Sequence, residues 1–416
     1  MPFQRPRGTQ DILPQDSARY LFLEQTARGV FGLYNFLEIR TPIIEDASLF
    51  VRSLGAITDI VEKQMFIIER DEGRLALRPE GTAGLIRAYV ENGLEKGLAS
   101  GKFFYIGPMF RGERPQKGRL RQFTHIGCES ISGDMPEVDA EVILLLDGLL
   151  RAFGLGDYKL KINTIGCNED KLLISKELYS YLNEKRQDLC HECQRRLDKN
   201  VFRVLDCKQP ACRAIARQAV DRISVCEACQ SHFETVLSYL DKFGINYEED
   251  RLLVRGLDYY TKTVFEVVHP NLSAGQDAIG AGGRYDNLLK EISGDKYDKG
   301  AVGFALGVER VLLCLGKDND ILGSPKVLVA YQDKSLMSNA LQLSSELRNQ
   351  GISCDFSLEP RSLKAQMRLA GRLKARFVIL LGEEEIRNST YTLKDMDSSV
   401  QKSGLSWDAL LEKISS

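Results

Sequence analysis

The spacing of apolar residues predicts a mixed set of helices and strands in the first part of the chain. It predicts a helix over 17–34 and then a strand over 36–40, which ends at Thr41-Pro42. Alternation of apolar and polar positions predicts strands around 63–68 and over 102–106, 123–129 and 263–268, and helical spacing predicts a long helix over 135–153. Strands and helices do not alternate regularly here, so the pattern indicates an α+β domain rather than a βαβ repeat.

The character of the chain changes between residues 166 and 247. This segment is helical in pattern, charged and rich in cysteine, and polar motifs that could carry chemistry lie on both sides of it. We therefore interpret 166–247 as a helical, cysteine-rich insertion within a domain that spans 1–322.

A regular alternation of strands and helices begins after residues 322–325, Leu-Gly-Ser-Pro. Strands are predicted over 327–330, 353–356 and 377–381, and helices over 336–350 and 363–373. This order predicts a small α/β domain with its own sheet over 325–416.

Composition narrows the classes of protein that fit. With 43% hydrophobic and 27% charged residues and no apolar run of membrane-spanning length, the 416-residue sequence is typical of a soluble multidomain protein. No apolar segment follows Arg5 and Arg7, so a secretory signal is not expected and we predict a cytoplasmic protein. A net charge of −2 argues against a broadly basic surface for nucleic acid, although local basic patches remain compatible with it.

An arginine-rich segment lies between two predicted strands. It follows Phe110 and contains Glu113, four arginines and one aromatic residue: Arg111, Arg114, Arg119, Arg121 and Phe123. Guanidinium groups can clamp a nucleotide triphosphate while an aromatic ring stacks on its base. Taken alone, the segment fits a solvated arginine-rich hairpin equally well.

Three motifs occur in an order that carries more information than any one of them. Arg40-Thr41-Pro42 ends a predicted strand, Phe110-Arg111 ends another, and Gly307-Val-Glu-Arg310 begins an apolar helix. Together they resemble the three signature motifs of class II aminoacyl-tRNA synthetases. The segments Arg255-Gly-Leu-Asp-Tyr-Tyr260 and Ala281-Gly-Gly-Arg-Tyr285 further resemble the histidine-specific signatures of the histidyl-tRNA synthetase family.

The resemblance implies a fold and an activity. The expected fold is a class II antiparallel-sheet catalytic domain with a helical insertion, followed by an anticodon-binding domain. The expected reaction joins histidine to its tRNA: ATP, with Mg²⁺, activates histidine to the adenylate, and the histidyl group then passes to the terminal adenosine of the tRNA. The strand that ends at Arg40-Thr41-Pro42 belongs to the family's dimer motif, which implies a homodimer.

The resemblance also implies roles for individual residues. A histidine substrate needs acceptors for its ammonium and ring N–H and donors for its carboxylate. The expected histidine-binding residues are Glu80, Thr82, Arg111, His125, Glu129, Arg255, Tyr259 and Tyr260. Of these, Arg111 and Arg255 are expected to be catalytic, because they would oppose the negative charge that develops at the α-phosphate. The expected ATP-binding residues are Arg111, Glu113, Arg119, Arg121, Phe123 and Arg310.

One expected site residue departs from the family pattern. His125 stands where the family commonly has a glutamine that binds the substrate carboxylate. An imidazole N–H can also donate to a carboxylate, but an imidazole is titratable near neutral pH. We therefore expect His125 to replace the glutamine functionally.

The cysteines leave two alternatives open. Six of the ten lie between Cys190 and Cys229, and Cys190-X-X-Cys193 and Cys226-X-X-Cys229 form two CxxC pairs. Four thiolates from these pairs would suit a structural zinc ion, whereas free thiols are the other reading for a chain in a reducing compartment.

Two other functions stay in competition with the synthetase. A regulatory paralogue would keep the fold and bind histidine as an effector, but such paralogues typically lack the carboxy-terminal module and the arginine at the position of Arg255. A synthetase for another amino acid of the same subclass is disfavoured by the two histidine signatures.

Overall fold

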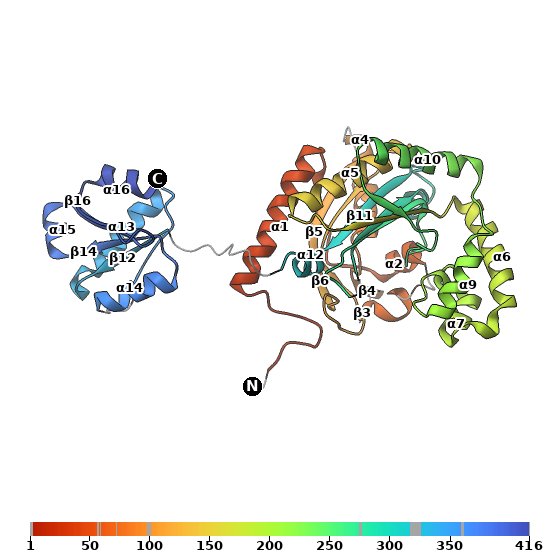
Figure 1. Ribbon diagram of the computed structural model, residues 1–416, viewed down its shortest axis with the longest axis horizontal. Coiled ribbons are helices and arrows are strands. Elements are labelled where there is room, and N and C mark those ends of the chain that lie inside the picture. The colour runs from red at the N-terminus through yellow and green to blue at the C-terminus, as the bar shows by residue number, and fades with distance from the viewer. Residues whose placement is uncertain are drawn as a thin grey trace. The chain divides into compact units, whose positions relative to one another are not determined.

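The structure is a computed structural model that describes residues 3–55, 58, 60–71, 73–97, 101–273, 277–316, 326–358 and 362–415. The chain forms two compact units, Met1–Asp320 and Ile321–Ser416. Figure 1 shows a mixed helical and sheet architecture in the first unit and a smaller α/β fold in the second. No helix among the described residues has the length and apolar character needed to cross a membrane.

An eight-stranded sheet forms the centre of the first unit. Its order is β1-β5-β6-β11-β10-β9-β7-β8, and all pairs except β1–β5 and β7–β8 are antiparallel. The strands are β1 (Leu37–Glu38), β5 (Lys102–Phe110), β6 (Gln122–Ser130), β7 (Lys159–Thr164), β8 (Tyr247–Glu249), β9 (Thr261–Val268), β10 (Ala278–Tyr285) and β11 (Ala301–Gly307). Because β6, β9, β10 and β11 are neighbours, motifs far apart in sequence lie on adjacent strands.

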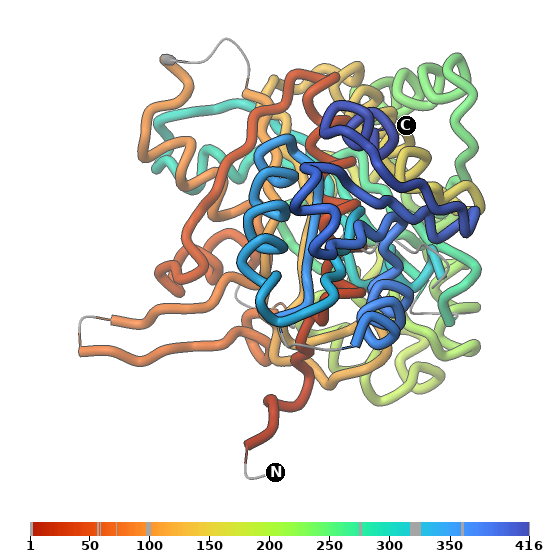
Figure 2. The backbone as a smooth tube through the Cα atoms, turned by 90° about the vertical axis from the view of Figure 1, so that its left-hand side faces the viewer, coloured from red at the N-terminus to blue at the C-terminus, as the bar shows by residue number. Residues whose placement is uncertain are grey.

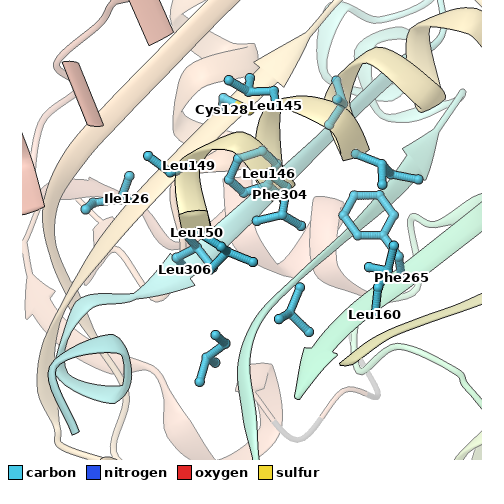
Figure 3. Close-up of a cluster of buried hydrophobic side chains, with 14 of the residues drawn as sticks. Ile126, Cys128, Leu145, Leu146, Leu149, Leu150, Leu160, Phe265, Phe304 and Leu306 are labelled. Carbon is cyan, nitrogen blue, oxygen red and sulfur yellow. The ribbon is translucent and has the colours of Figure 1, made fainter. Parts of the chain in front are cut away.

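Helices α1 (Pro14–Leu33), α5 (Pro136–Ala152) and α12 (Val308–Cys314) supply side chains to the main core of this unit. Leu145, Leu146, Leu149 and Leu150 of α5 follow the spacing of one helical face and are at most 1% exposed. Figure 3 shows them beside Ile126, Cys128, Phe304 and Leu306 from β6 and β11. Helices therefore cover one face of the sheet, and the other face remains available for a functional site.

A second, three-stranded sheet has the order β2-β4-β3, with β2 at Ile44–Asp46, β3 at Phe66–Arg70 and β4 at Gly73–Leu77. Figure 2 shows β3 and β4 as a hairpin that projects from the body (orange). The remaining helices around this sheet are α2 (Ala47–Leu54), a π-helix (Ile60–Gln64), α3 (Thr82–Glu91), α4 (Leu94–Gly97) and α11 (Leu288–Ser293).

The cysteine-rich segment is helical, as its pattern predicts. Its helices are α6 (Asn168–Glu184), a 3-10 turn (Arg186–Asp188), α7 (His191–Lys199), α8 (Phe202–Leu205), α9 (Pro210–Val220) and α10 (Glu227–Lys242). Helices α6–α9 share a separate core that includes Leu178, Cys193 and Ala216. Phe233, Val236 and Leu240 of α10 instead pack into the main core, so the last helix of 166–247 belongs to the body of the unit.

The second unit has the sheet order β13-β12-β14-β15-β16. Its elements are β12 (Val327–Tyr331), a 3-10 turn (Lys334–Leu336), α13 (Met337–Asn349), β13 (Cys354–Phe356), α14 (Leu363–Arg372), β14 (Phe377–Leu381), α15 (Glu383–Asn388), β15 (Tyr391–Asp395), β16 (Gln401–Leu405) and α16 (Trp407–Ser415). Up to β14 the elements match the expected strands and helices within about one residue. The antiparallel β14-β15-β16 edge and α16 were not predicted.

Candidate functional site

A cavity of about 760 Å³ opens on the sheet face opposite α5 and extends to the inserted helices. It brings together residues from separate parts of the sequence. The expected site residues that line it are Glu80, Thr82, Arg111, Glu113, Arg119, Phe123, His125, Glu129, Arg255, Tyr259, Tyr260 and Arg310. Among the expected residues, Arg121 is not part of this lining.

Strand alternation explains the floor of the cavity. On β6, Phe123, His125 and Glu129 point into the cavity, whereas Ile126 and Cys128 on the other face join the main core. Gly127 continues the cavity face, and a β-carbon there would lie 2.6 Å from the Tyr105 hydroxyl oxygen. The nine-residue strand β6 thus supplies side chains that line the cavity and, on its other face, side chains that pack into the main core.

A buried hydrogen-bond network fixes the carboxylates of the floor. Glu80 accepts hydrogen bonds from the backbone N–H groups of Thr82 (2.6 Å) and Ala83 (2.9 Å), which are free because α3 begins there. Glu129 accepts from the Thr82 hydroxyl at 2.5 Å and from the Tyr285 hydroxyl at 2.6 Å. Glu80 and Glu129 are at most 4% exposed, and these hydrogen bonds hold each carboxylate in place.

Burial changes the protonation of this network. Desolvation raises the pKa of Glu129 to about 8, and it also raises the pKa of Glu80. The site is thus arranged to gain from a cationic or N–H-bearing ligand, because such a ligand would offset the cost of burying ionised carboxylates.

The raised pKa of Glu129 predicts a pH-dependent stability in the histidine-free protein. Between the unfolded value near 4.5 and the folded value near 8, the native state holds a proton that the unfolded state has released. Stability therefore falls as pH rises through this window. The Tm of Glu129→Gln minus the Tm of the unchanged protein is expected to increase as pH rises from about 5 to 9. Calorimetry that shows a constant difference in Tm would contradict the raised pKa.

Tyrosines enclose the same end of the cavity. The rings of Tyr259 and Tyr260 have centroids 4.6 Å apart, and Tyr259 meets Tyr285 edge-on at 5.4 Å. Burial raises the pKa of all three hydroxyls. They consequently remain protonated at neutral pH and are available as hydrogen-bond donors as well as acceptors.

Two arginines line the same cavity as these carboxylates. The Arg111 Nε donates to the Pro79 carbonyl at 2.9 Å, and its guanidinium carbon lies 5.3 Å from the centre of the Phe123 ring. Arg255 forms an ion pair with Glu266, with 2.6 Å between Nη1 and Oε2. The buried Arg255 Nε has no hydrogen-bond partner within the described part of the chain. This leaves a fixed donor for an oxygen of a bound ligand.

A second group of cationic residues lines the outer part of the cavity. Arg119 pairs with Glu113 at 3.6 Å, while Arg310 donates to the carbonyls of Gly118 (3.1 Å) and Ala278. Arg121 instead donates to the carbonyl of Arg7 at 3.3 Å. Its side chain therefore ties the amino-terminal segment to the arginine-rich loop.

His125 is half-buried in the cavity floor, with its ring centre 5.0 Å from that of Phe123. Desolvation, followed by the nearby charges of Arg111 and Arg78, lowers the pKa of His125 to about 3. Within the described residues its Nδ1 has no hydrogen-bond partner. The imidazole is therefore neutral near pH 7, because it is desolvated and lies close to cationic side chains.

A neutral His125 predicts that glutamine can substitute for it. Both side chains are neutral and offer an N–H donor and an acceptor, so His125→Gln is expected to keep the KM for histidine within about threefold. The pH profiles of the two proteins should also coincide between about pH 6 and 9. Steady-state kinetics across this range test the point, and a profile that changes shape in the variant would show that the imidazole carries charge.

Several lining residues were not assigned roles from the sequence. Glu266 pairs with Arg255, Tyr285 donates to Glu129, and Glu309 accepts from the Thr124 N–H at 2.8 Å. Glu266 and Tyr285 lie within segments already noted for their family resemblance, so their motifs were a signal that could have identified them. Gly303 has no such signal: it matters because β11 pairs it with Glu129.

The four cysteines expected to bind zinc together, Cys190, Cys193, Cys226 and Cys229, do not form one group. The structure divides the two CxxC pairs between two groups, one of Cys190, Cys193, Cys207 and Cys212 and the other of Cys167, Asp170, Cys226 and Cys229. The physical reason is the packing of the helices. Cys190 and Cys193 begin α7 in the insertion core, whereas Cys226 and Cys229 begin α10, which packs on the body of the unit.

Comparisons with known proteins agree with this geometry. A family model described as histidyl-tRNA synthetase matches residues 8–311, and one described as an anticodon binding domain matches residues 326–416. Proteins named histidine–tRNA ligase are 43% identical in Desulforamulus reducens (over 96% of this chain and 96% of that one) and 44% identical in Halothermothrix orenii, with the same coverage.

Solved structures show the same similarity. The histidyl-tRNA synthetase of S. aureus is 33% identical, with a TM-score of 0.81 and all of both chains covered. A structure from Bacillus halodurans C titled as an ATP phosphoribosyltransferase regulatory subunit/histidyl-tRNA synthetase is 22% identical, with a TM-score of 0.63, and covers 91% of this chain and 98% of its own. At that identity it supports the fold alone.

Proposed function

The chain belongs to the histidyl-tRNA synthetase family, and we propose that the cavity on the eight-stranded sheet is where it binds histidine and ATP. The chain activates histidine with ATP and joins it to tRNA. One observation carries the assignment of the site: the buried carboxylates of Glu80 and Glu129 and the guanidinium groups of Arg111 and Arg255 line the same cavity. An amino acid, with a cationic and an anionic end, is complementary to that arrangement.

In this proposal the floor of the cavity recognises the cationic and N–H groups of histidine. Glu80 and Thr82 accept from the ammonium, whereas Glu129, Tyr259 and Tyr260 surround the imidazole ring. Because Glu129 is already held by Thr82 and Tyr285, it presents its remaining lone pairs in a fixed direction. An apolar analogue would leave these buried acceptors unpaired, so histidine would be selected strongly.

The arginines serve the first chemical step. An oxygen of the histidine carboxylate forms a bond to the α-phosphorus of ATP, and the bond from that phosphorus to the pyrophosphate oxygen breaks. Arg111, Arg255 and the neutral His125 N–H stabilise the oxygens on which negative charge develops. The Arg255–Glu266 ion pair holds the guanidinium in position before substrate arrives.

The outer part of the cavity suits the nucleotide. Phe123 stacks on adenine, Glu113 contacts the adenine side, and Arg119 and Arg310 bind phosphate oxygens. We propose that Mg²⁺ enters bound to the triphosphate. The Glu309 carboxylate lines this part of the cavity and offers the kind of oxygen ligand that Mg²⁺ prefers. Arg121 acts indirectly, because it holds the loop on which Arg119 lies.

The second step needs no protein nucleophile. A ribose hydroxyl of the terminal adenosine of the tRNA attacks the carbonyl carbon of the adenylate, and AMP leaves. The carboxy-terminal unit matches an anticodon-binding domain over residues 326–416, which supports recognition of the tRNA anticodon by this unit. Such charging is part of translation, and we propose a cytoplasmic location on that ground.

Exchange of labelled pyrophosphate into ATP tests the substrate assignment. Histidine is expected to support exchange, while threonine, proline and glycine at the same concentration should give at most about 1% of its rate, because they lack an imidazole N–H for Glu129. Comparable rates with any of the three would show that another amino acid is the substrate.

We also propose that the protein is a homodimer. The expected dimer motif ends at Pro42, and the apolar side chains of Leu37, Ile43 and Ile44 near it are 41–48% exposed in the single chain. A symmetric partner would cover them.

The dimer predicts a specific effect of Ile44→Glu. Charge repulsion at a symmetric apolar contact is expected to shift the protein from twice the chain mass to the chain mass in light scattering at micromolar concentration. Leu341→Glu, which alters an exposed apolar residue of the second unit, is the matched control and should leave the mass unchanged. A monomer before any substitution would contradict the proposal.

A further inference from the structure

Four cysteines of the insertion converge on one point. Cys190 and Cys193 come from the start of α7, Cys207 from the loop after α8, and Cys212 from α9. Each of the four sulfur atoms lies within 4.8 Å of the others, and those of Cys190 and Cys207 are 3.9 Å apart. A disulfide would need about 2.05 Å. Four thiolates around zinc, each at about 2.3 Å, lie about 3.8 Å from one another.

The backbone around the cluster is arranged for thiolates. The Cys190 N–H donates to the sulfur of Cys212 at 3.1 Å, and the Gln209 N–H donates to the sulfur of Cys207 at 3.5 Å. Cys190 is the N-cap of α7, so the positive end of that helix faces the cluster. These donors would offset negative charge on sulfur.

The cluster also lies in a small core that a crosslink would stabilise. Cys193, Cys207 and Cys212 are buried in the small core shared by α6–α9. A core of this size supplies limited stability by itself, and small folds are commonly reinforced by a metal or by disulfides. A metal bound by these residues would join α7 and α9 and fix the loop between α8 and α9.

We propose that the insertion binds one zinc ion through the thiolates of Cys190, Cys193, Cys207 and Cys212. Four sulfur ligands in a tetrahedral arrangement favour zinc over harder cations. The set leaves no open coordination position, so the ion has a structural role.

The proposed ion would also shape the candidate active site. Arg203, Asp206 and Lys208 lie on the segment that carries Cys207, and all three line the cavity. The same inserted helices contact the catalytic body: Lys199 pairs with Glu62 at 2.6 Å, and the Asn200 amide donates to Asp258 at 3.1 Å. Zinc would thus set the position of one wall of the cavity, which Cys190 and Cys207 themselves line.

The second group, Cys167, Asp170, Cys226 and Cys229, provides a control for a metal analysis. Its carboxylate, Asp170, already accepts from the backbone N–H groups of Cys167 (3.1 Å) and Cys226 (3.0 Å), as the cap of α6. Cys226 is exposed, in contrast to the buried Cys207 and Cys212. Asp170 thus has a structural role in this group that requires no metal ion.

Metal analysis of the full-length protein, purified under reducing conditions without chelator, tests the proposal. The double variant Cys207→Ser/Cys212→Ser is expected to contain one equivalent of zinc less than the unchanged protein. The control double variant Cys226→Ser/Cys229→Ser should contain as much zinc as the unchanged protein. Cobalt in place of zinc should give the visible spectrum of a tetrahedral tetrathiolate in the unchanged protein and in the control variant. Zinc absent from the unchanged protein, iron in its place, or loss of metal only in the control variant would each overturn the proposal.

A second measurement needs no substitution, and so does not depend on whether the variants fold. Alkylation of the unchanged protein, mapped by mass spectrometry, is expected to spare Cys190, Cys193, Cys207 and Cys212 together, and a chelator should expose all four at the same rate. Alkylation of these four that is insensitive to the chelator would contradict a shared ion.

Discussion

Arg255→Ala is expected to lower histidine-dependent exchange of pyrophosphate into ATP by about 1,000-fold. The guanidinium is positioned by Glu266, and its buried Nε has no partner among the described residues. Charge develops on the α-phosphate oxygens in the transition state, so the loss should fall mainly on kcat. Rates measured at saturating histidine and ATP separate this effect from a change in binding.

The control for Arg255→Ala is Arg251→Ala. Arg251 lies four residues away and pairs with Asp221 at 3.6 Å on the surface, where its side chain is 53% exposed. The control should retain nearly all activity, because an exposed ion pair contributes little to stability. Exchange by Arg255→Ala within about tenfold of the unchanged protein would contradict a role for this arginine at the reacting phosphate.

Gly303→Ala is expected to raise the KM for histidine by about 10- to 100-fold. β11 holds Gly303 opposite Glu129, and a β-carbon at Gly303 would lie 1.8 Å from Glu129 Oε2 and 2.3 Å from the Cys128 carbonyl oxygen. The carboxylate would have to leave the position that Thr82 and Tyr285 define. Histidine binding by calorimetry, with Tm measured alongside, tests the expected loss.

Gly148→Ala provides the comparison for the glycine substitution. This glycine lies on α5, and a β-carbon there meets only the Tyr34 hydroxyl, at 3.9 Å. The control should leave the KM unchanged and keep or raise the Tm, since alanine favours helix. An unchanged KM in a folded Gly303→Ala protein would show that Glu129 does not bind the substrate.

Local patterns in the sequence predicted much of the first unit because its elements obey simple periodicities. The alternation over 123–129 predicted β6, and the apolar spacing over 135–153 predicted α5 (Pro136–Ala152). Strand alternation also explains why residues at positions 123, 125 and 129 share the cavity face. The edge strand expected over 36–40 is shorter, Leu37–Glu38, because only this part pairs with β5.

Local sequence patterns could not predict the contacts between residues that lie far apart in the sequence. The importance of Gly303 depends on the strand that lies beside it, and the α6–α10 segment looks uniform in sequence although α10 joins a different core. The same limit explains the cysteines: CxxC spacing predicts that two neighbours can share an ion, but only helix packing shows that Cys190 and Cys193 meet Cys207 and Cys212.

Transfer of labelled histidine to histidine tRNA, in the presence of ATP and Mg²⁺, tests the central claim most directly. The account predicts that the full chain forms histidyl-tRNA and that the product depends on ATP and on the tRNA. A folded protein that binds histidine in the cavity and forms neither the adenylate nor histidyl-tRNA would contradict it, and would instead indicate a regulatory protein that keeps the fold.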